Sequence, residues 1–329
     1  MKRVSVIGAG SWGTALAIVA AKAGHNVQLW SRNSAVLSAI QQYRTNTIYL
    51  KEVHIPGAVH ATGDLSQALD AELLILAAPS HVLRDLLGSI SSGIRDETIV
   101  VSAAKGIEVE TGKRVSQIAA EVLSEATPFV CLSGPSFAKE VVQDHPTAVV
   151  AASLKHEAAR VVQETMSCGS LRIYTNSDVI GTELGGSIKN VMAIAAGMVS
   201  GLGLGSNSLA ALITRGLAEM SRLAIQQGGK LETMMGLAGL GDLVLTCTGS
   251  LSRNRFVGEQ LAKGRNVDQI TSEMNEVAEG IKTTRAVKRL AEKCGIEMPI
   301  TNQVNDVIYN NKNVSDAVMN LMSRPLRQE

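Results

Sequence analysis

A glycine-rich turn near the start of the chain constrains the fold more than any other feature. The segment VSVIGAGSWGTALA places Gly8, Gly10 and Gly13 directly after a short apolar run and at the opening of a helical pattern. This spacing allows a tight turn, a close approach of ligand phosphates to the backbone and close packing of helix on strand. It predicts a strand-turn-helix unit that binds a dinucleotide, with the pyrophosphate at the helix N-terminus. A merely tight turn, a flavin site and an S-adenosylmethionine site are the alternatives.

The first half of the chain alternates short apolar runs with amphipathic segments. Helical patterns such as Ser11 to Ala23 and Arg114 to Leu123 lie between the runs. The runs are continuously apolar, so both faces of the sheet should be covered, which predicts a parallel, doubly wound α/β fold. The predicted strands are residues 3–8, 26–30, 73–79, 98–106, 128–135 and 147–153.

The strand pattern stops at about Asp178, and long helical patterns follow. We therefore predict two domains, residues 1–178 and residues 179–329, of which the second is mostly α-helical. The uncharged run from Asn190 to Thr214 is long enough to span a bilayer. Glycines and polar residues interrupt it, so we expect two buried helices joined by a turn, and no membrane span. The helices predicted in this half are residues 209–227, 252–262, 279–293 and 299–309.

Charge and cysteine content exclude several classes of protein. A formal net charge of +1 gives no electrostatic reason to expect a nucleic acid or an anionic membrane as partner. The four cysteines are widely spaced and form no CxxC pair, which favours a reducing compartment without structural zinc or any other metal. The N-terminal MKRVSVIGAG has the basic start of a signal peptide, but Gly8 interrupts its apolar run, so a strand is the better interpretation. We expect a cytoplasmic enzyme.

The end of the second predicted strand, NVQLWSRN, bears on the choice of dinucleotide. NAD sites usually place an acidic residue here, about 20 residues beyond the glycines, to bind the ribose 2′-hydroxyl. This chain has Ser31 and Arg32 instead. An arginine can pair with a 2′-phosphate, which predicts NADPH (NADP+) as the preferred cofactor, with NADH (NAD+) left open. The alternative for Arg32 is a solvated loop residue.

A single lysine stands out in the second half. Lys189 is the only charge between Glu183 and Arg215, and no carboxylate lies one helical turn from it. Reduction of a carbonyl by a nicotinamide needs a proton donor, and all six histidines precede the helical half. We place Lys189 at the start of the first long helix as the candidate acid, because burial can lower its pKa. The alternative is a lysine that reaches solvent. The glycines beside it would let cofactor and substrate approach closely.

Two segments after predicted strands carry further candidates. Lys105 lies at the end of the fourth predicted strand, where open α/β sheets bind ligands, although a solvated loop lysine is the alternative. Gly134, Pro135 and Ser136 follow the fifth strand and open a predicted helix, where backbone donors could meet an anion.

A polar segment in the second half offers a phosphate site. Asp242 follows a glycine-rich loop, and Ser252, Arg253 and Asn254 stand at a predicted helix start. Their polarity and positive charge suit a phosphate. A helix N-cap followed by surface arginines is the alternative on spacing alone.

Taken together, these segments resemble the NAD(P)-dependent glycerol-3-phosphate dehydrogenases of the bacterial, single-chain type. The resemblance implies an N-terminal Rossmann-type doubly wound domain and a C-terminal all-α domain of the 6-phosphogluconate dehydrogenase C-terminal-like type. The active site would lie between the domains. The matching segments run in order along nearly the whole chain: GAGSWGTALA, AAKGIE, LSGPSFAKEV, ELGGSIKNVMAIAAG, GLGDLVLTCTG, SRNRFVG and VAEGIKTTRAV.

The resemblance also implies a reaction and a set of site residues. The reaction is reduction of dihydroxyacetone phosphate by NADPH to sn-glycerol 3-phosphate for glycerophospholipid synthesis, with Lys189 as the catalytic acid/base. The substrate would be held by Lys105, Gly134, Ser136, Lys189, Asp242, Ser252, Arg253 and Asn254. The cofactor would be held by Gly8, Gly10, Ser11, Trp12, Gly13, Arg32, Lys105, Ala138, Arg253, Val277 and Glu279.

Two other functions remain open at this point. A reductase with the same two-domain plan could act on ketopantoate or on a 3-hydroxyacyl thioester. A non-enzymatic NADPH sensor would bind the cofactor without an acid facing it. The apolar helices of the second half are compatible with a homodimer.

Overall fold

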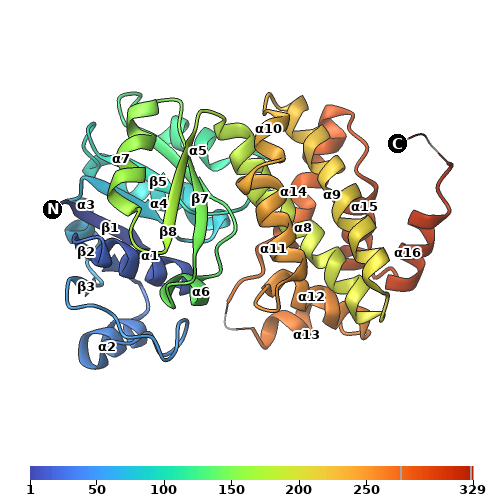
Figure 1. Ribbon diagram of the computed structural model, residues 1–329, viewed down its shortest axis with the longest axis horizontal. Helices are drawn as coiled ribbons and strands as arrows, with labels where there is room; N and C mark the ends of the chain where they lie inside the picture. Colours follow the sequence, from blue (N-terminus) through green and yellow to red (C-terminus); the bar gives the residue numbers. More distant parts are fainter. Residues whose placement is uncertain (275, 327, 329) are drawn as a thin grey trace.

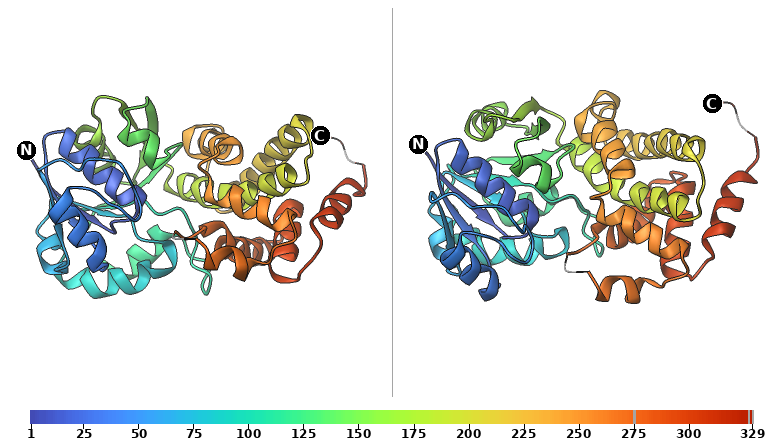
Figure 2. Two further views of the ribbon diagram at one scale, coloured as in Figure 1. Left: turned by 90° about the horizontal axis from the view of Figure 1, so that it is seen from below. Right: turned by 60° about the horizontal axis from the view of Figure 1, so that its bottom comes forward.

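The computed structural model describes residues 1–274, 276–326 and 328. Strands and helices alternate up to Asn176, and only helices follow within these residues (Figure 1). The helical part lies beside one end of the sheet rather than over its faces, as two further views show (Figure 2).

Eight strands form one sheet in the order β3-β2-β1-β4-β5-β6-β7-β8. All neighbours are parallel except β6 and β7, so the prediction of a wholly parallel sheet is wrong at this pair. The link between them holds one five-residue helix, α6 (Ala138–Val142), which is too short to return the chain along the sheet. The strands are β1 (Arg3–Ile7), β2 (Asn26–Trp30), β3 (Val59–Thr62), β4 (Leu73–Leu76), β5 (Ile99–Ser102), β6 (Phe129–Ser133), β7 (Thr147–Ala152) and β8 (Leu171–Asn176).

Six of these strands lie where the sequence predicts them, including β1 in the segment that resembled a signal peptide. The pattern does not predict β3 and β8, the two strands at the edges of the sheet. Both are partly exposed, and β8 alternates buried and exposed residues along its first four positions. A search for continuous apolar runs therefore finds the central strands and misses the edges.

Helices cover both faces of the sheet, which confirms the doubly wound arrangement. Along β4, Leu73 and Ile75 enter one apolar core, and Leu74 and Leu76 enter a second core on the opposite face. This alternation explains why the whole strand is apolar. The helices of this part are α1 (Ser11–Lys22), α2 (Ser34–Tyr43), α3 (Leu65–Leu69), α4 (Leu83–Ile90), α5 (Val115–Val122), α6 and α7 (His156–Met166), with single turns η1 (Ser80–Val82) and η2 (Ser91–Gly93).

The helical part is built around α8 (Val179–Gly201), which is buried along most of its length. The predicted helices are confirmed to within a few residues. The others are α9 (Ser206–Gln226), α10 (Leu231–Met234), the π-helical turn η3 (Leu237–Gly241), α11 (Asp242–Thr248), α12 (Arg253–Ala262), α13 (Val267–Ser272), α14 (Glu279–Cys294), α15 (Pro299–Tyr309) and α16 (Val314–Met322).

The long uncharged run forms the end of α8 and the start of α9, as two helices joined by a turn. The prediction that both are buried is only half right, since the first turns of α9 are largely exposed. Across the described ranges, no single helix is long and apolar enough to cross a membrane. Two helical segments with a bend between them, Leu231–Thr248 and Arg253–Ala262, are together long and apolar enough, judged by length and composition alone.

A buried ionic contact ties α8 to the sheet domain. The Glu183 carboxylate accepts hydrogen bonds from Arg114 Nη1 at 2.6 Å, from Ser116 N at 2.7 Å and from Ser116 Oγ at 2.5 Å. Burial raises the pKa of Glu183, while Arg114 and Ser116 oppose that shift. The contact lies two turns before Lys189 on α8, so it helps to fix that lysine relative to the strand ends.

Replacing Ser116 with alanine should lower the free energy of unfolding by about 1–2 kcal/mol, because one hydrogen bond to a buried carboxylate is lost. Arg114 Nη1, which also donates to this hydroxyl at 2.7 Å, loses a partner as well. Denaturant unfolding of the full chain measures the change. Ser272→Ala, which removes an exposed hydroxyl, is the matched control. Equal stability of the two variants would contradict the anchoring role.

Candidate active site

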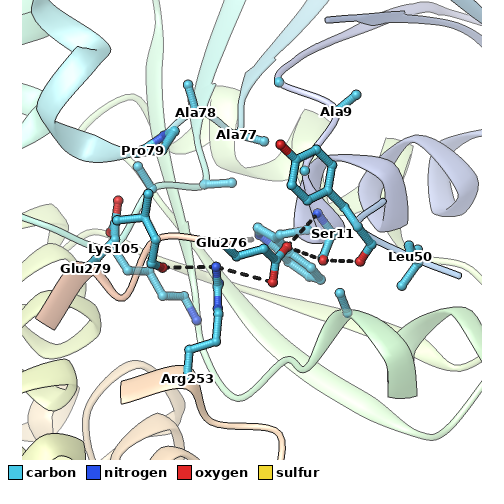
Figure 3. Close-up of a pocket in the computed structure, with 18 of the residues that line it drawn as sticks. Ala9, Ser11, Leu50, Ala77, Ala78, Pro79, Lys105, Arg253, Glu276 and Glu279 are labelled. Atoms are coloured by element: carbon cyan, nitrogen blue, oxygen red, sulfur yellow. Dashed lines mark hydrogen bonds and ion pairs between the residues drawn. The ribbon is translucent and has the colours of Figure 1, made fainter. Parts of the chain in front are cut away.

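A cavity of about 1270 Å³ opens between the carboxyl ends of the strands and the helical domain. Its walls come from the loops after β1, β2, β4, β5 and β6 on one side, and from α8, α11, α12 and the segment before α14 on the other (Figure 3). The strand order reverses between β1 and β4, which is where open α/β sheets bind ligands.

The cavity brings together most of the residues that the sequence predicts for the site. Three predicted residues are not part of its lining: Gly13, Gly134 and Asp242. Each of these three instead contacts a lining residue, as described below. The predicted residues that line it are Gly8, Gly10, Ser11, Trp12, Arg32, Lys105, Ser136, Ala138, Lys189, Ser252, Arg253, Asn254, Val277 and Glu279.

The glycine turn has the geometry of a dinucleotide site. Gly8 has a φ of +114°, a conformation that favours glycine. A Cβ on Gly13 would lie 1.8 Å from Gly8 O, so Gly13 allows α1 to pack against the turn. A Cβ on Gly10 would meet no atom within 4 Å, because Gly10 borders the open cavity. The N-terminus of α1 thus faces a space that admits a phosphate group.

Arg32 places a positive charge where β2 ends. Arg32 is exposed and lines the cavity together with His81 of η1. Burial lowers the pKa of His81, and the positive charges of Lys282 and Arg32 lower it further. No acidic residue ends β2, so this part of the cavity suits a phosphate better than a bare ribose.

Lys189 lies in the third turn of α8, not at the start of the helix as predicted. Its Nζ donates to Asp242 Oδ1 at 2.9 Å and to Thr246 Oγ1 at 2.7 Å, both on α11. The other oxygen of Asp242 accepts from Lys105 Nζ at 2.6 Å, and Lys105 Nζ also donates to Gly134 O at 2.7 Å. The side chain of Lys189 is 9% exposed, so the alternative of a lysine that reaches solvent is wrong.

The charges of this cluster favour proton transfer. Burial lowers the pKa of Lys189 and the positive charge of Lys105 adds to this shift, so that against the opposing effect of Asp242 the pKa is about 8. Burial alone would raise the pKa of Asp242, but Lys105 and Lys189 together hold it below its usual value. The cluster therefore pairs an ionised carboxylate with an ammonium group that releases its proton near neutral pH.

Two expectations about glycines are wrong. A Cβ on Gly185 would lie 2.5 Å from Ala238 O, and one on Gly186 would lie 2.5 Å from Ser133 Oγ. These glycines let α8 pack against η3 and β6 rather than make room for ligands. The predicted glycine-rich loop before Asp242 is helical, because η3 leads directly into α11.

The polar segment at the start of α12 combines a structural and a binding role. Ser252 is the N-cap of α12, and its Oγ accepts from Arg255 N at 3.2 Å, as the N-cap alternative predicts. Asn254 Oδ1 accepts from Gly280 N at 2.9 Å. Arg253 is half-exposed, and its Nη1 donates to Val277 O at 3.1 Å. Of these residues, Arg253 has the guanidinium best placed to reach a ligand (Figure 3).

Ser136 does not open a helix, because α6 begins two residues later at Ala138. Its Oγ donates to Gly134 O at 2.9 Å, beside the Lys105 contact to the same oxygen. Glu279, also part of the cavity lining, accepts from Ser80 N at 2.8 Å, and burial raises the pKa of its carboxyl group.

Several polar residues of the cavity lining were not predicted from the sequence, among them Asn190, Thr246 and Glu276. Asn190 Nδ2 donates to Lys105 O at 3.0 Å, and its Oδ1 accepts from Asn254 Nδ2 at 2.9 Å. Thr246 donates to Asp242 O, one helical turn back, and contacts Lys189. Reading the segment after Gly241 as a helix would have found Thr246 from its i,i+4 spacing with Asp242. The third is Glu276, for which the sequence gives no signal.

Two family models match most of the chain. The family model described as NAD-dependent glycerol-3-phosphate dehydrogenase N-terminus matches residues 3–159. The family model for the C-terminus of the same enzyme matches residues 178–319. A Koribacter versatilis protein named glycerol-3-phosphate dehydrogenase (NAD(P)+) is 50% identical, over 100% of this chain and 99% of its own length. A Chlorobium phaeobacteroides protein of the same name is 46% identical over 99% of both.

Solved structures agree with these relatives. The crystal structure of glycerol-3-phosphate dehydrogenase from Coxiella burnetii is 39% identical and superposes with a TM-score of 0.95, covering 98% of this chain and 99% of that chain. A ketopantoate reductase from Ralstonia eutropha, at 16% identity and a TM-score of 0.57, covers 97% of this chain and 99% of that chain and shares the fold alone. On these matches along its whole length, the chain belongs to the NAD-dependent glycerol-3-phosphate dehydrogenase family.

Proposed function

We propose that this chain is a glycerol-3-phosphate dehydrogenase that uses NADPH to reduce dihydroxyacetone phosphate to sn-glycerol 3-phosphate. The observation that carries the proposal is the buried Lys189–Asp242–Lys105 cluster facing the ends of the strands. Relatives at 46–50% identity along the whole chain bear the name of this enzyme.

The residues present fit a dinucleotide. Gly10 leaves open space at the N-terminus of α1, and Arg32 supplies positive charge at the end of β2. When bound, NADPH supplies the hydride for reduction of the substrate carbonyl. The residues proposed to hold it are Gly8, Gly10, Ser11, Trp12, Gly13, Arg32, Lys105, Ala138, Arg253, Val277 and Glu279.

The lysine cluster would complete the reduction. Lys189 Nζ donates its proton to the carbonyl oxygen, and Lys105 stabilises the negative charge that develops there. Asp242, bonded to both lysines, fixes their positions. The substrate phosphate would lie near Arg253, beside Ser252 and Asn254, with Ser136 at the other wall of the site. Gly134 would act from behind that wall, where its carbonyl oxygen holds Lys105.

The test is a substrate panel in which NADPH absorbance is followed. Dihydroxyacetone phosphate should be reduced much faster than ketopantoate or an acetoacetyl thioester. Tight NADPH binding without oxidation of NADPH by any of them would favour the sensor function instead. The same assay with NADH in place of NADPH measures the cofactor preference, for which Arg32 predicts NADPH.

We also propose where and in what form the protein works. Residues 1–178 would form the cofactor domain and residues 179–329 the substrate domain, supported by the end of β8 at Asn176 and the start of α8 at Val179. The cysteines among the described residues are all free, which suits the cytoplasm, where the product would supply phospholipid synthesis. Exposed apolar side chains such as Ile225 and Met235 suit a homodimer.

The lowered pKa of Lys189 predicts opposite pH profiles for the two directions. Reduction needs the ammonium form, so its turnover should be level below about pH 7 and fall as the pH rises through about 8. Oxidation of sn-glycerol 3-phosphate needs the neutral amine, so its turnover should rise as the pH passes through about 8 and level off about one pH unit above that. Steady-state rates at saturating substrates measure both profiles. A reduction rate that increases through pH 8 would contradict the role of Lys189.

A further inference from the structure

A glutamate from the helical domain occupies the phosphate position of the glycine turn. Glu276 lies in the segment of residues 276–278, immediately before α14. Its Oε1 accepts from Ser11 N at 3.3 Å and lies within hydrogen-bond distance of Ser11 Oγ (Figure 3). Its other oxygen, Oε2, forms an ion pair with Arg253 at 3.5 Å.

The first residues of α1 provide no side chain that binds the N–H groups at its N-terminus, so an anion from another part of the chain or from a ligand can bind there. Gly10, the N-cap, has no side chain to bond the first N–H groups, and the first turn contains no acidic residue. A carboxylate at this end of a 12-residue helix is stabilised by the N–H groups and by the helix dipole. Within the described part of the chain, Glu276 is the side chain that supplies that charge.

The same position is needed by a bound dinucleotide, whose pyrophosphate lies at this helix N-terminus. A carboxylate bonded to Ser11 N and a phosphate bonded to the same N–H group exclude each other. The carboxylate also holds Arg253, which the proposed function assigns to substrate and cofactor phosphates. One side chain thus covers a cofactor position and a phosphate-binding guanidinium together.

We propose that Glu276 is an internal competitor of the cofactor phosphates. It bridges Ser11 and Arg253 in the free protein and leaves the N-terminus of α1 when the dinucleotide binds. Its departure frees Arg253 for a phosphate, so cofactor binding and substrate binding are coupled through this one carboxylate. The inference rests on the proposed function only in taking the glycine turn as a nicotinamide dinucleotide site.

The test compares cofactor binding in the full chain with and without the competing charge. In Glu276→Gln and Glu276→Ala, the Kd of NADPH, measured by fluorescence titration, should fall by about 5- to 20-fold relative to wild type, because a charged competitor is lost. Glu276→Asp, with a shorter side chain, should give an intermediate value.

The Kd of sn-glycerol 3-phosphate is a second measurement, and it would not change if Glu276 had only a structural role. In wild type, NADP+ should tighten the binding of sn-glycerol 3-phosphate, because it frees Arg253. In Glu276→Gln, the cofactor-free protein should bind sn-glycerol 3-phosphate several-fold tighter, and the effect of NADP+ should shrink accordingly. Glu273→Gln is the matched control, since it makes the same charge change at an exposed residue outside the cavity, and neither Kd should move.

Unchanged NADPH binding in both Glu276→Gln and Glu276→Ala would overturn the inference. Weaker binding would overturn it as well, because Glu276 would then help to hold the cofactor. If wild type binds NADPH but does not reduce dihydroxyacetone phosphate, the proposed function fails, and the Kd comparison still decides the competitor role. Binding of neither NADPH nor NADH by wild type would overturn both.

Discussion

Replacement of Lys189 with alanine is expected to lower the turnover of dihydroxyacetone phosphate by about two to four orders of magnitude, the usual contribution of a general acid. The Kd of NADPH should change by no more than a few-fold, because the hydrogen bonds of Lys189 are made to Asp242 and Thr246 on α11. The pyrophosphate is expected at the glycine turn instead. Steady-state kinetics and fluorescence titration measure the two effects separately. Near-normal turnover would remove Lys189 from the mechanism.

The alanine variant also disturbs a buried ion pair, so a second variant is needed. Without Lys189, Asp242 keeps only Lys105 as a charged partner and remains buried. Lys189→Arg retains the positive charge beside Asp242, but an arginine does not release its proton near neutral pH. This variant should therefore remain folded and still turn over slowly. Lys293→Ala, on the exposed last turn of α14, is the matched control and should behave as wild type.

Much of the sheet could be predicted from sequence because its central strands are buried on both faces. In β4, Leu73 to Leu76 are all buried, so the strand appears as an unbroken apolar run. The edge strand β8 is buried on alternate residues and does not stand out. β7 pairs antiparallel with β6 because α6, the helix between them, has five residues. The mixed apolar and charged sequence of this segment does not show that its helix is so short.

The chemistry of Lys189 could be predicted only in part. An isolated lysine in an apolar helix signals a functional charge, but its partner Asp242 lies 53 residues further along the chain. No local spacing rule connects the two residues. The same holds for Glu276, which is 265 residues from Ser11, its hydrogen-bond partner. The contact of Lys189 with Asp242 lies within the helical domain, and that of Glu276 with Ser11 joins the two domains. Both depend on tertiary structure, which decides the protonation and the occupancy of the site.

Two glycines of the turn, Gly10 and Gly13, should differ in their effect on stability while both affect NADPH binding. In Gly10→Ala, the new methyl group enters open space bordering the cavity, and the backbone of Gly10 (φ −73°) suits alanine. The free energy of unfolding should change by no more than about 1 kcal/mol, the cost of alanine at an N-cap. The methyl group would stand where the pyrophosphate approaches, so the Kd of NADPH should rise by about 10- to 100-fold.

In Gly13→Ala, the new methyl group would lie 1.8 Å from Gly8 O, and the backbone must move to relieve the contact. This variant should lose about 2–3 kcal/mol of folding free energy, as overpacked sites do, and should bind NADPH weakly because the turn is displaced. Denaturant unfolding and NADPH titration of both variants separate the two roles. A marked loss of stability in Gly10→Ala, or unchanged NADPH binding, would show that the space beside Gly10 is not the position of the cofactor phosphates. Stability loss confined to Gly13→Ala, with NADPH binding lost in both, would show that one glycine shapes the turn and the other leaves room for the ligand.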